Sequence, residues 1–208
     1  APLEARLERV RERTGGGVDA LSNTGASAQA GAVEDLPVAA LKQQFEANFF
    51  GWHDLTRRLV PVMRRQGHGR IVHCSSILGL APVRFPGAYS ASKHALEGLM
   101  LCLHQELRGS CIHVSLIEPG PVTSKIASNG LFWFLKNIDH EKSVHRADYE
   151  AQPARLMAGA RVSRLYPGRR AVTASRRLPH RPHRLRRYRM STRRRRCPRL
   201  RQRLRRRC

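Results

Sequence analysis

Short apolar runs and long helical patterns alternate along residues 18–117, and this alternation limits the fold more than any other feature of the sequence. Apolar residues at 18–21, 70–75 and 112–117 are typical of strands. Between them, at about 38–66 and 88–107, apolar residues recur at steps of three and four, which predicts helices. A strand–helix–strand–helix–strand order requires parallel pairing with right-handed crossovers. The sequence therefore predicts an α/β fold with a Rossmann-type, doubly wound parallel sheet.

Capping and turn residues indicate where these elements begin and end. Asp35 is a candidate cap of the first long helix, and Pro37 suits its first turn. Pro61 is expected to kink or end that helix, and the glycines of residues 67–69 to stop it. Three parallel strands make a small sheet, and each of its edges needs a neighbour. We therefore expect part of the fold to be absent from this chain.

The charge of the chain divides it into two regions. Its 39 Lys and Arg residues against 15 Asp and Glu residues give a net charge of +24, and 21 of the Arg residues lie in residues 161–208. That segment contains no Lys, Asp or Glu, so residues 1–160 keep 18 basic and 15 acidic residues, a net charge of +3. We interpret residues 1–160 as a partial Rossmann-type domain and residues 161–208 as a tail that is disordered or frame-shifted.

Two origins of the Arg-rich tail stay open. A selected basic tail would bind phosphates nonspecifically and with a steep dependence on salt. A reading-frame change in a GC-rich gene would also give Arg-rich sequence, and the absence of Lys favours this second interpretation.

Several classes of protein are excluded by composition. No run of 18 or more apolar residues occurs, so a membrane span is not expected. The charged N-terminal sequence lacks the apolar stretch of a secretory signal, which favours the cytoplasm. The five Cys residues show no ligand spacing, so no metal site is predicted.

Chemistry-bearing side chains are expected to meet at one edge of the sheet. Tyr89 and Lys93 are four residues apart and share one face of a helix. Ser76 follows a strand, at the carboxyl edge where α/β sheets present functional groups. Asn48 lies within an apolar helix, where an amide needs a buried partner or a function, and Pro119–Gly120 closes the last strand.

These residues stand in motifs that resemble the short-chain dehydrogenase/reductase family. The motifs are LSNTGA, FEANFFG, IVHCSSILG, GAYSASKHALEGL and IEPGPVTS, in the order and spacing of that family across about residues 1–150. The resemblance implies a catalytic tetrad of Asn48, Ser76, Tyr89 and Lys93. It also implies that NAD or NADP is bound by Asn23, Tyr89, Lys93, Pro119, Gly120, Val122 and Ser124.

The resemblance implies a role for each member of the tetrad in the interconversion of an alcohol and a ketone or aldehyde. Tyr89 supplies or takes the proton, and the charge of Lys93 lowers the phenol pKa from its ordinary value of about 10. Lys93 also holds the nicotinamide ribose. Ser76 orients the substrate oxygen, and Asn48 holds a water that connects Lys93 to solvent.

The sequence also departs from the family pattern. The family's N-N-A-G stretch is Asn23-Thr24-Gly25-Ala26 here, and Ser124 replaces a usual Thr. The Gly-rich T-G-x-x-x-G-x-G motif, which binds the pyrophosphate, does not occur. We expect the first three strands of the family fold to be missing, and the chain alone to bind the dinucleotide weakly and to be inactive. The choice between NAD and NADP is not readable.

Three further expectations concern partners. The apolar residues 131–135 indicate either a lid over a hydrophobic small-molecule substrate or an ordinary amphipathic helix. The resemblance implies homo-oligomers that assemble through the two long helices. An alternative function is that of a non-enzymatic basic protein that binds nucleic acid through its Arg-rich tail.

Overall fold

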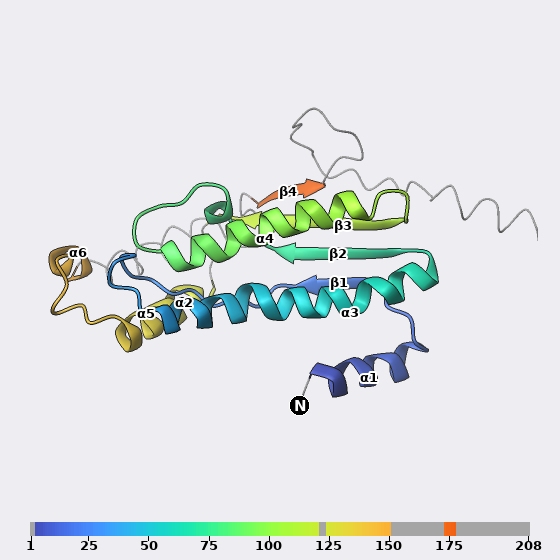
Figure 1. Ribbon diagram of the computed structural model, residues 1–208, viewed down its shortest axis with the longest axis horizontal. Helices are drawn as coiled ribbons and strands as arrows, with labels where there is room; N and C mark the ends of the chain where they lie inside the picture. The colour runs from blue at the N-terminus through green and yellow to red at the C-terminus, as the bar shows by residue number, and fades with distance from the viewer. Residues whose placement is uncertain (1–2, 121–123, 151–172, 178–208) are drawn as a thin grey trace, which may run out of the picture.

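The computed structural model describes residues 3–120, 124–150 and 173–177 (Figure 1). Within the described residues, eight helical segments and four strands follow one another along the chain. They are α1 (Leu3–Thr14), β1 (Ala20–Asn23), α2 (Val38–Phe45), the π-helix η1 (Glu46–Phe50), α3 (Gly51–Gln66), β2 (Gly69–Cys74), the 3-10 helix η2 (Ile77–Gly79), α4 (Gly87–Glu106), β3 (Ile112–Pro119), α5 (Ile126–Asn137), α6 (Arg146–Glu150) and β4 (Thr173–Arg177).

The sheet has the strand order β1-β2-β3-β4. The first three strands are parallel, with Leu21 opposite Ile71 and Ile71 opposite Val114. The predicted α/β fold with a Rossmann-type parallel sheet is therefore confirmed. β4, in the Arg-rich segment, pairs antiparallel with β3, and the division of the chain at residue 160 into a domain and a disordered tail stays a prediction. The rest of the tail at 161–208 lies outside the described residues.

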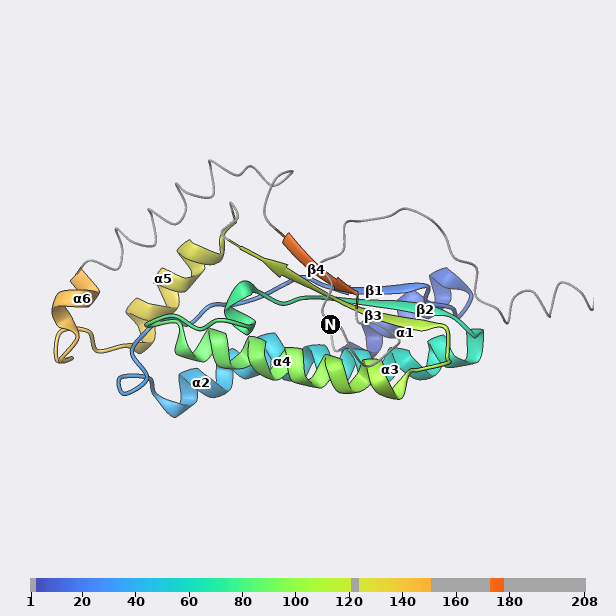
Figure 2. The same ribbon diagram turned by 90° about the horizontal axis from the view of Figure 1, so that it is seen from above.

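The hydrophobic core lies between the sheet and two helices. Figure 2 shows α3 and α4 along one face of the strands. Side chains of the strands alternate between buried and more exposed, because period-two geometry sends neighbouring residues to opposite faces. The buried set from the sheet and the helices forms one cluster. It contains Leu7, Leu21, Trp52, Leu59, Met63, Ile71, Leu96, Met100, Leu107, Ile112, Val114 and Leu116.

The predicted helix at about 38–66 is divided by a π-helical turn between α2 and α3. Gly67 ends α3 with a left-handed φ of 82°, as expected for a glycine at this position. Pro61 does not end the helix, which continues to Gln66. Asp35 is not the cap, because Pro37 occupies that position and no side chain caps the helix.

Asp35 instead bonds to a segment more than a hundred residues away. Its carboxylate accepts hydrogen bonds of 2.5 Å from Ser143 Oγ and from the Tyr149 hydroxyl. Tyr149 in turn accepts from the Ala32 backbone N–H at 2.7 Å. These bonds attach α6 to the loop before α2, and they hold the pKa of Asp35 below its ordinary value although partial burial opposes this.

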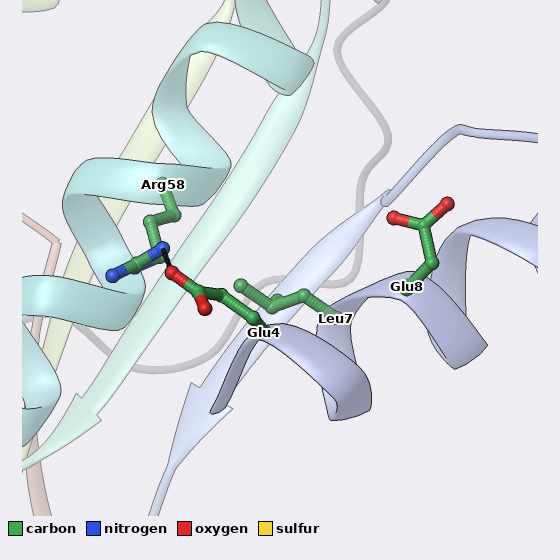
Figure 3. A pocket seen from close by; sticks show the side chains of 4 residues that line it. All are labelled: Glu4, Leu7, Glu8 and Arg58. Atoms are coloured by element: carbon green, nitrogen blue, oxygen red, sulfur yellow. Dashed lines mark hydrogen bonds and ion pairs between the residues drawn. The ribbon is translucent and has the colours of Figure 1, made fainter. Parts of the chain in front are cut away.

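α1 docks beside α3 through one apolar and one charged contact. Leu7 is 8 % exposed and belongs to the main core, and Glu4 accepts a hydrogen bond of 3.2 Å from Arg58 (Figure 3). A shallow hollow of about 180 Å³ remains between these side chains and Glu8.

The apolar residues 131–135 lie in α5, beyond the carboxyl ends of the parallel strands (Figure 1). Phe134 is buried in a small second core with Ala32, Ile138 and Tyr149. Phe132 and Leu135 point outward and are 58 % and 56 % exposed. The helix is thus amphipathic, and its exposed apolar side chains keep the lid interpretation open.

Candidate active site

Ser76 and Tyr89 meet at the carboxyl end of β2. Ser76 caps η2, since its Oγ accepts a hydrogen bond of 3.2 Å from the Leu78 N–H. Tyr89 lies in the first turn of α4, and the Ser76 side chain is near enough to act on its phenol and lower the phenol pKa, against the larger effect of burial. Both side chains are buried, at 7 % and 8 % exposure. Two polar groups that are 13 positions apart in the sequence therefore share one site.

Lys93 lies one turn after Tyr89 on α4 and is fully buried. Its Nζ donates a hydrogen bond of 2.8 Å to the Cys74 carbonyl at the end of β2. The same nitrogen lies 5.6 Å from the centre of the Tyr89 ring and 4.5 Å from the Trp52 ring. The ammonium thus lies between the end of a strand and two aromatic rings.

The close approach of η2 to α4 depends on a glycine. A Cβ added to Gly79 would lie 2.9 Å from Ser75 Oγ, 3.1 Å from Lys93 Cβ and 3.3 Å from the Lys93 backbone carbon. Any side chain at this position would push η2 away from α4. The absence of a Cβ at Gly79 thus allows Ser76 to reach the helix that carries Tyr89 and Lys93.

Asn48 is fully buried in the π-helical turn η1. Its Oδ1 accepts from the Ser27 N–H at 2.9 Å, and its Nδ2 donates to the Ser27 carbonyl at 2.9 Å. Nδ2 also lies 3.3 Å from Ser92 Oγ on α4. The Asn48 amide therefore connects the loop after β1 with α4. Its contact on α4, Ser92, directly precedes Lys93. The water-holding role of Asn48 stays a prediction.

Burial dominates the electrostatics of the site. The pKa of Tyr89 is raised above its ordinary value by burial, and the Ser76 side chain opposes this only in part. Burial lowers the pKa of Lys93 to about 8, against the charges of Cys74 and Glu97. The expected depression of the phenol pKa is therefore wrong for this fold, because desolvation of Tyr89 outweighs the opposing effect of Ser76.

His73 is a buried polar residue that the sequence analysis did not single out. Its Nδ1 lies 3.2 Å from Asn23 Nδ2, and its Nε2 lies 3.3 Å from Thr56 Oγ1. Burial, with a smaller effect of the Lys93 charge, lowers its pKa to about 4. Asn23 therefore bonds to a neutral imidazole beneath the site. The alternation of residues along β2 could have predicted the burial of His73, because His73 lies two residues after Ile71 and on the same face of the strand.

The remaining residues implied in cofactor binding lie at or after the end of β3. Pro119 and Gly120 are half-buried, and the Ser75 N–H donates to the Ile117 carbonyl at 2.7 Å, which joins the ends of β2 and β3. Ser124 is exposed, and its Oγ accepts from the Ile126 N–H at 3.3 Å. Val122 lies outside the described residues.

Other kinds of site find no support among the described residues. No group of three or more His, Cys, Asp or Glu side chains could hold a metal ion in this part of the chain. None of the described helices is both long and apolar enough to cross a membrane. A groove of about 260 Å³ lies on the outer side of α3 and α4, away from Tyr89, and is lined by Val60, Leu99 and Leu103 among others.

Comparisons with known proteins agree with this geometry. The family model described as short chain dehydrogenase matches residues 1–131. An uncharacterized oxidoreductase of Escherichia coli, YbbO, is 50 % identical over 99 residues, which are 48 % of this chain and 37 % of that protein. Retinol dehydrogenase 8 of Homo sapiens is 42 % identical over 110 residues, 53 % of this chain and 35 % of that protein.

The chain is also similar to a solved structure of a short-chain dehydrogenase. A short-chain dehydrogenase from Streptomyces avermitilis has a TM-score of 0.54 and 38 % identity, over 56 % of this chain and 43 % of that one. The chain spans less than half the length of these relatives. The family model covers more than half of the chain and includes every residue of the predicted tetrad. The chain belongs to the short-chain dehydrogenase family.

Proposed function

We propose that this chain carries the catalytic residues of an NAD(P)-dependent oxidoreductase that interconverts an alcohol and a ketone or aldehyde. The observation that carries the proposal is that Ser76 and Tyr89 are both buried at the end of β2, where the Ser76 side chain acts on the pKa of the Tyr89 phenol, with the buried Lys93 ammonium one turn away. Tyr89 gives its proton to the substrate oxygen during reduction and takes it back during oxidation. Ser76 donates a hydrogen bond to the same oxygen and fixes its position.

The residues present fit the nicotinamide and ribose half of the cofactor. An ammonium has three N–H donors, and the Cys74 carbonyl occupies one of those of Lys93. A remaining donor is suited to ribose hydroxyls, and Asn23, Pro119, Gly120, Val122 and Ser124 are the further candidate contacts. NAD or NADP, when bound, supplies or accepts the hydride. The sequence offers no Gly-rich motif for the pyrophosphate.

Apolar side chains near the site support a hydrophobic small-molecule substrate. Ile77, Leu80 and Val83, in the segment between Ser76 and Tyr89, are 42 %, 45 % and 59 % exposed. Phe132 and Leu135 are exposed on α5. Retinol dehydrogenase 8, one of the relatives, is named for an apolar alcohol. We propose that bulky apolar alcohols or ketones are the substrate class.

Hydride transfer to a panel of apolar and polar ketones tests this proposal. The full chain is assayed with millimolar NADH or NADPH, so that weak cofactor binding does not hide the reaction. At micromolar dinucleotide we expect the chain alone to be inactive, because the Gly-rich motif does not occur in residues 1–208. At millimolar dinucleotide, which compensates for weak binding, we expect slow turnover with apolar ketones that requires Tyr89. Substitution of Arg193–Arg196 by Gln is the control for the tail and should leave the rate unchanged. Absence of turnover with every ketone, in a chain with native circular dichroism, would refute the proposal.

Cofactor affinity is tested separately. Because the Gly-rich motif does not occur in residues 1–208, we expect fluorescence titration with NADH and NADPH to give weak binding. Micromolar affinity for either dinucleotide would overturn this expectation.

The interpretations about partners and location stay predictions. Assembly through α3 and α4 is supported by the apolar groove on their outer side. Nucleic-acid binding depends on the Arg-rich segment 161–208, of which the structure describes residues 173–177. Salt-sensitive retention on nucleic acid that disappears when the tail arginines are replaced would favour it.

A further inference from the structure

Lys93 and Trp52 form a buried contact that the proposed chemistry does not use. Lys93 Nζ lies 4.5 Å from the centre of the Trp52 ring, within the range of about 6 Å over which a cation is attracted to an aromatic face. Lys93 is fully buried and Trp52 is 8 % exposed. Since little water screens it, this attraction is stronger than a similar contact on the surface. The contact also joins α3 to α4.

The Trp52 ring also packs against the side chain of His73. The His73 imidazole stacks on it, with ring centres 5.6 Å apart and planes 23° apart. Both nitrogens of His73 have polar partners, Asn23 and Thr56, which fix the plane of the imidazole. With a pKa of about 4, His73 is neutral near pH 7 and adds no second positive charge beside Lys93.

The other groups that act on Lys93 come from its own helix and from β2. Glu97, one turn further along α4, and Cys74 on β2 favour the charged form, whereas burial disfavours it. The phenol of Tyr89 lies one turn before. The net pKa of about 8 leaves the ammonium close to losing its proton near neutral pH. A contact that stabilises the charge therefore has a large influence on the protonation of Lys93.

We propose that Trp52 is a positioning residue: the face of its indole keeps Lys93 charged and in place beside Tyr89, and His73 fixes the plane of that indole. The consequence for catalysis rests on the proposed function. The contact and its effect on the charge of Lys93 do not rest on the proposed function, because they depend only on how Trp52 and Lys93 are packed.

The protonation of Lys93 can be measured directly by NMR in the labelled full chain. The chain has five lysines, and the Lys93→Met variant assigns the signal of Lys93. We expect Trp52→Leu to lower the pKa of Lys93 by about one pH unit, and Trp52→Phe to retain part of the effect. Trp133→Phe is the matched control, since its ring faces Lys136 at 5.0 Å and not Lys93. That variant should leave Lys93 unchanged.

An isosteric series separates electrostatics from packing. In the Trp133→Phe background, Trp52 is the one remaining tryptophan, and fluorinated tryptophans can be incorporated there without a change of shape. Fluorine weakens the negative face of the ring, so the pKa of Lys93 should fall with each added fluorine. An unchanged pKa across this series would overturn the proposal. A falling pKa in a chain without hydride transfer would uphold the contact and refute the proposed function instead.

Discussion

The buried side chains of Tyr89 and Ser76 lie close enough for Ser76 to influence the phenol pKa, so a helix and the end of a strand bring two hydroxyl groups together. Lys93 lies one turn behind, fully buried and bonded to the Cys74 carbonyl. Burial raises the phenol pKa above its ordinary value, so Tyr89 carries its proton near neutral pH. Tyr89 can therefore donate a proton, which the reduction of a carbonyl group requires.

Replacement of Ser76 tests the orientation of the substrate oxygen. We expect Ser76→Ala to reduce the rate of hydride transfer by about a hundredfold, because one preorganised donor to the reacting oxygen is lost. Ser75→Ala is the matched control, since Ser75 Oγ is buried without a hydrogen-bond partner in the described residues. Equal rates for the two variants would show that Ser76 does not touch the substrate.

The stability of the fold should depend on Lys93. The pKa of Lys93 is about 8 in the folded chain and has its ordinary value of 10.5 when unfolded. Between pH 8 and pH 10.5, Lys93 is protonated in the unfolded chain and largely neutral in the folded chain, so the free energy of unfolding rises with pH. Below pH 8, Lys93 is charged in both states, and burying this charge lowers the free energy of unfolding by its full amount. We expect Lys93→Met to stabilise the chain at neutral pH by up to about 3 kcal/mol.

This difference should disappear as the pH approaches 10.5, and urea unfolding of both chains across this range measures it. Lys136→Met, on the exposed side of α5, is the control and should show no such trend. A constant difference between Lys93→Met and the parent at all pH values would mean that Lys93 is not perturbed.

Acid should destabilise the chain through His73. Its pKa is about 4 in the folded chain against 6.5 ordinarily. Between pH 6.5 and pH 4, His73 is protonated in the unfolded chain but stays neutral in the folded chain. The free energy of unfolding therefore falls as the pH is lowered through this range. His73→Phe should remove this part of the loss, while His53→Asn, at an exposed position of α3, should retain it. Identical acid profiles of His73→Phe and the parent would contradict this assignment.

Apolar periodicity was sufficient to predict the parallel strands and both long helices. Residues such as Leu59, Ile71 and Leu96 are buried where the steps of two, three and four place them. The π-helical turn at Asn48 was not predictable in the same way. One extra residue in a helical turn leaves the spacing of Phe45, Phe49 and Trp52 almost unchanged.

Contacts between residues far apart in the sequence could not be predicted either. Asp35 precedes a helix and has the side chain of a cap, yet its hydrogen bonds go to Ser143 and Tyr149. Strand β4 has the sequence TASRR, which is too polar and short to be distinguished from a loop. The tetrad residues were recognised because their motifs occur together, whereas Trp52 and His73 belong to no such motif.

We propose that the Tyr89 hydroxyl transfers the proton in an alcohol–ketone interconversion. The most direct test of this proposal compares hydride transfer by the full chain and by Tyr89→Phe, at millimolar NADPH or NADH with an apolar ketone, with Tyr188→Phe as the matched control. We expect Tyr89→Phe to lower the rate by at least about a hundredfold while Tyr188→Phe keeps the rate of the parent. Equal rates for Tyr89→Phe and the parent would show that the Tyr89 hydroxyl does not transfer the proton.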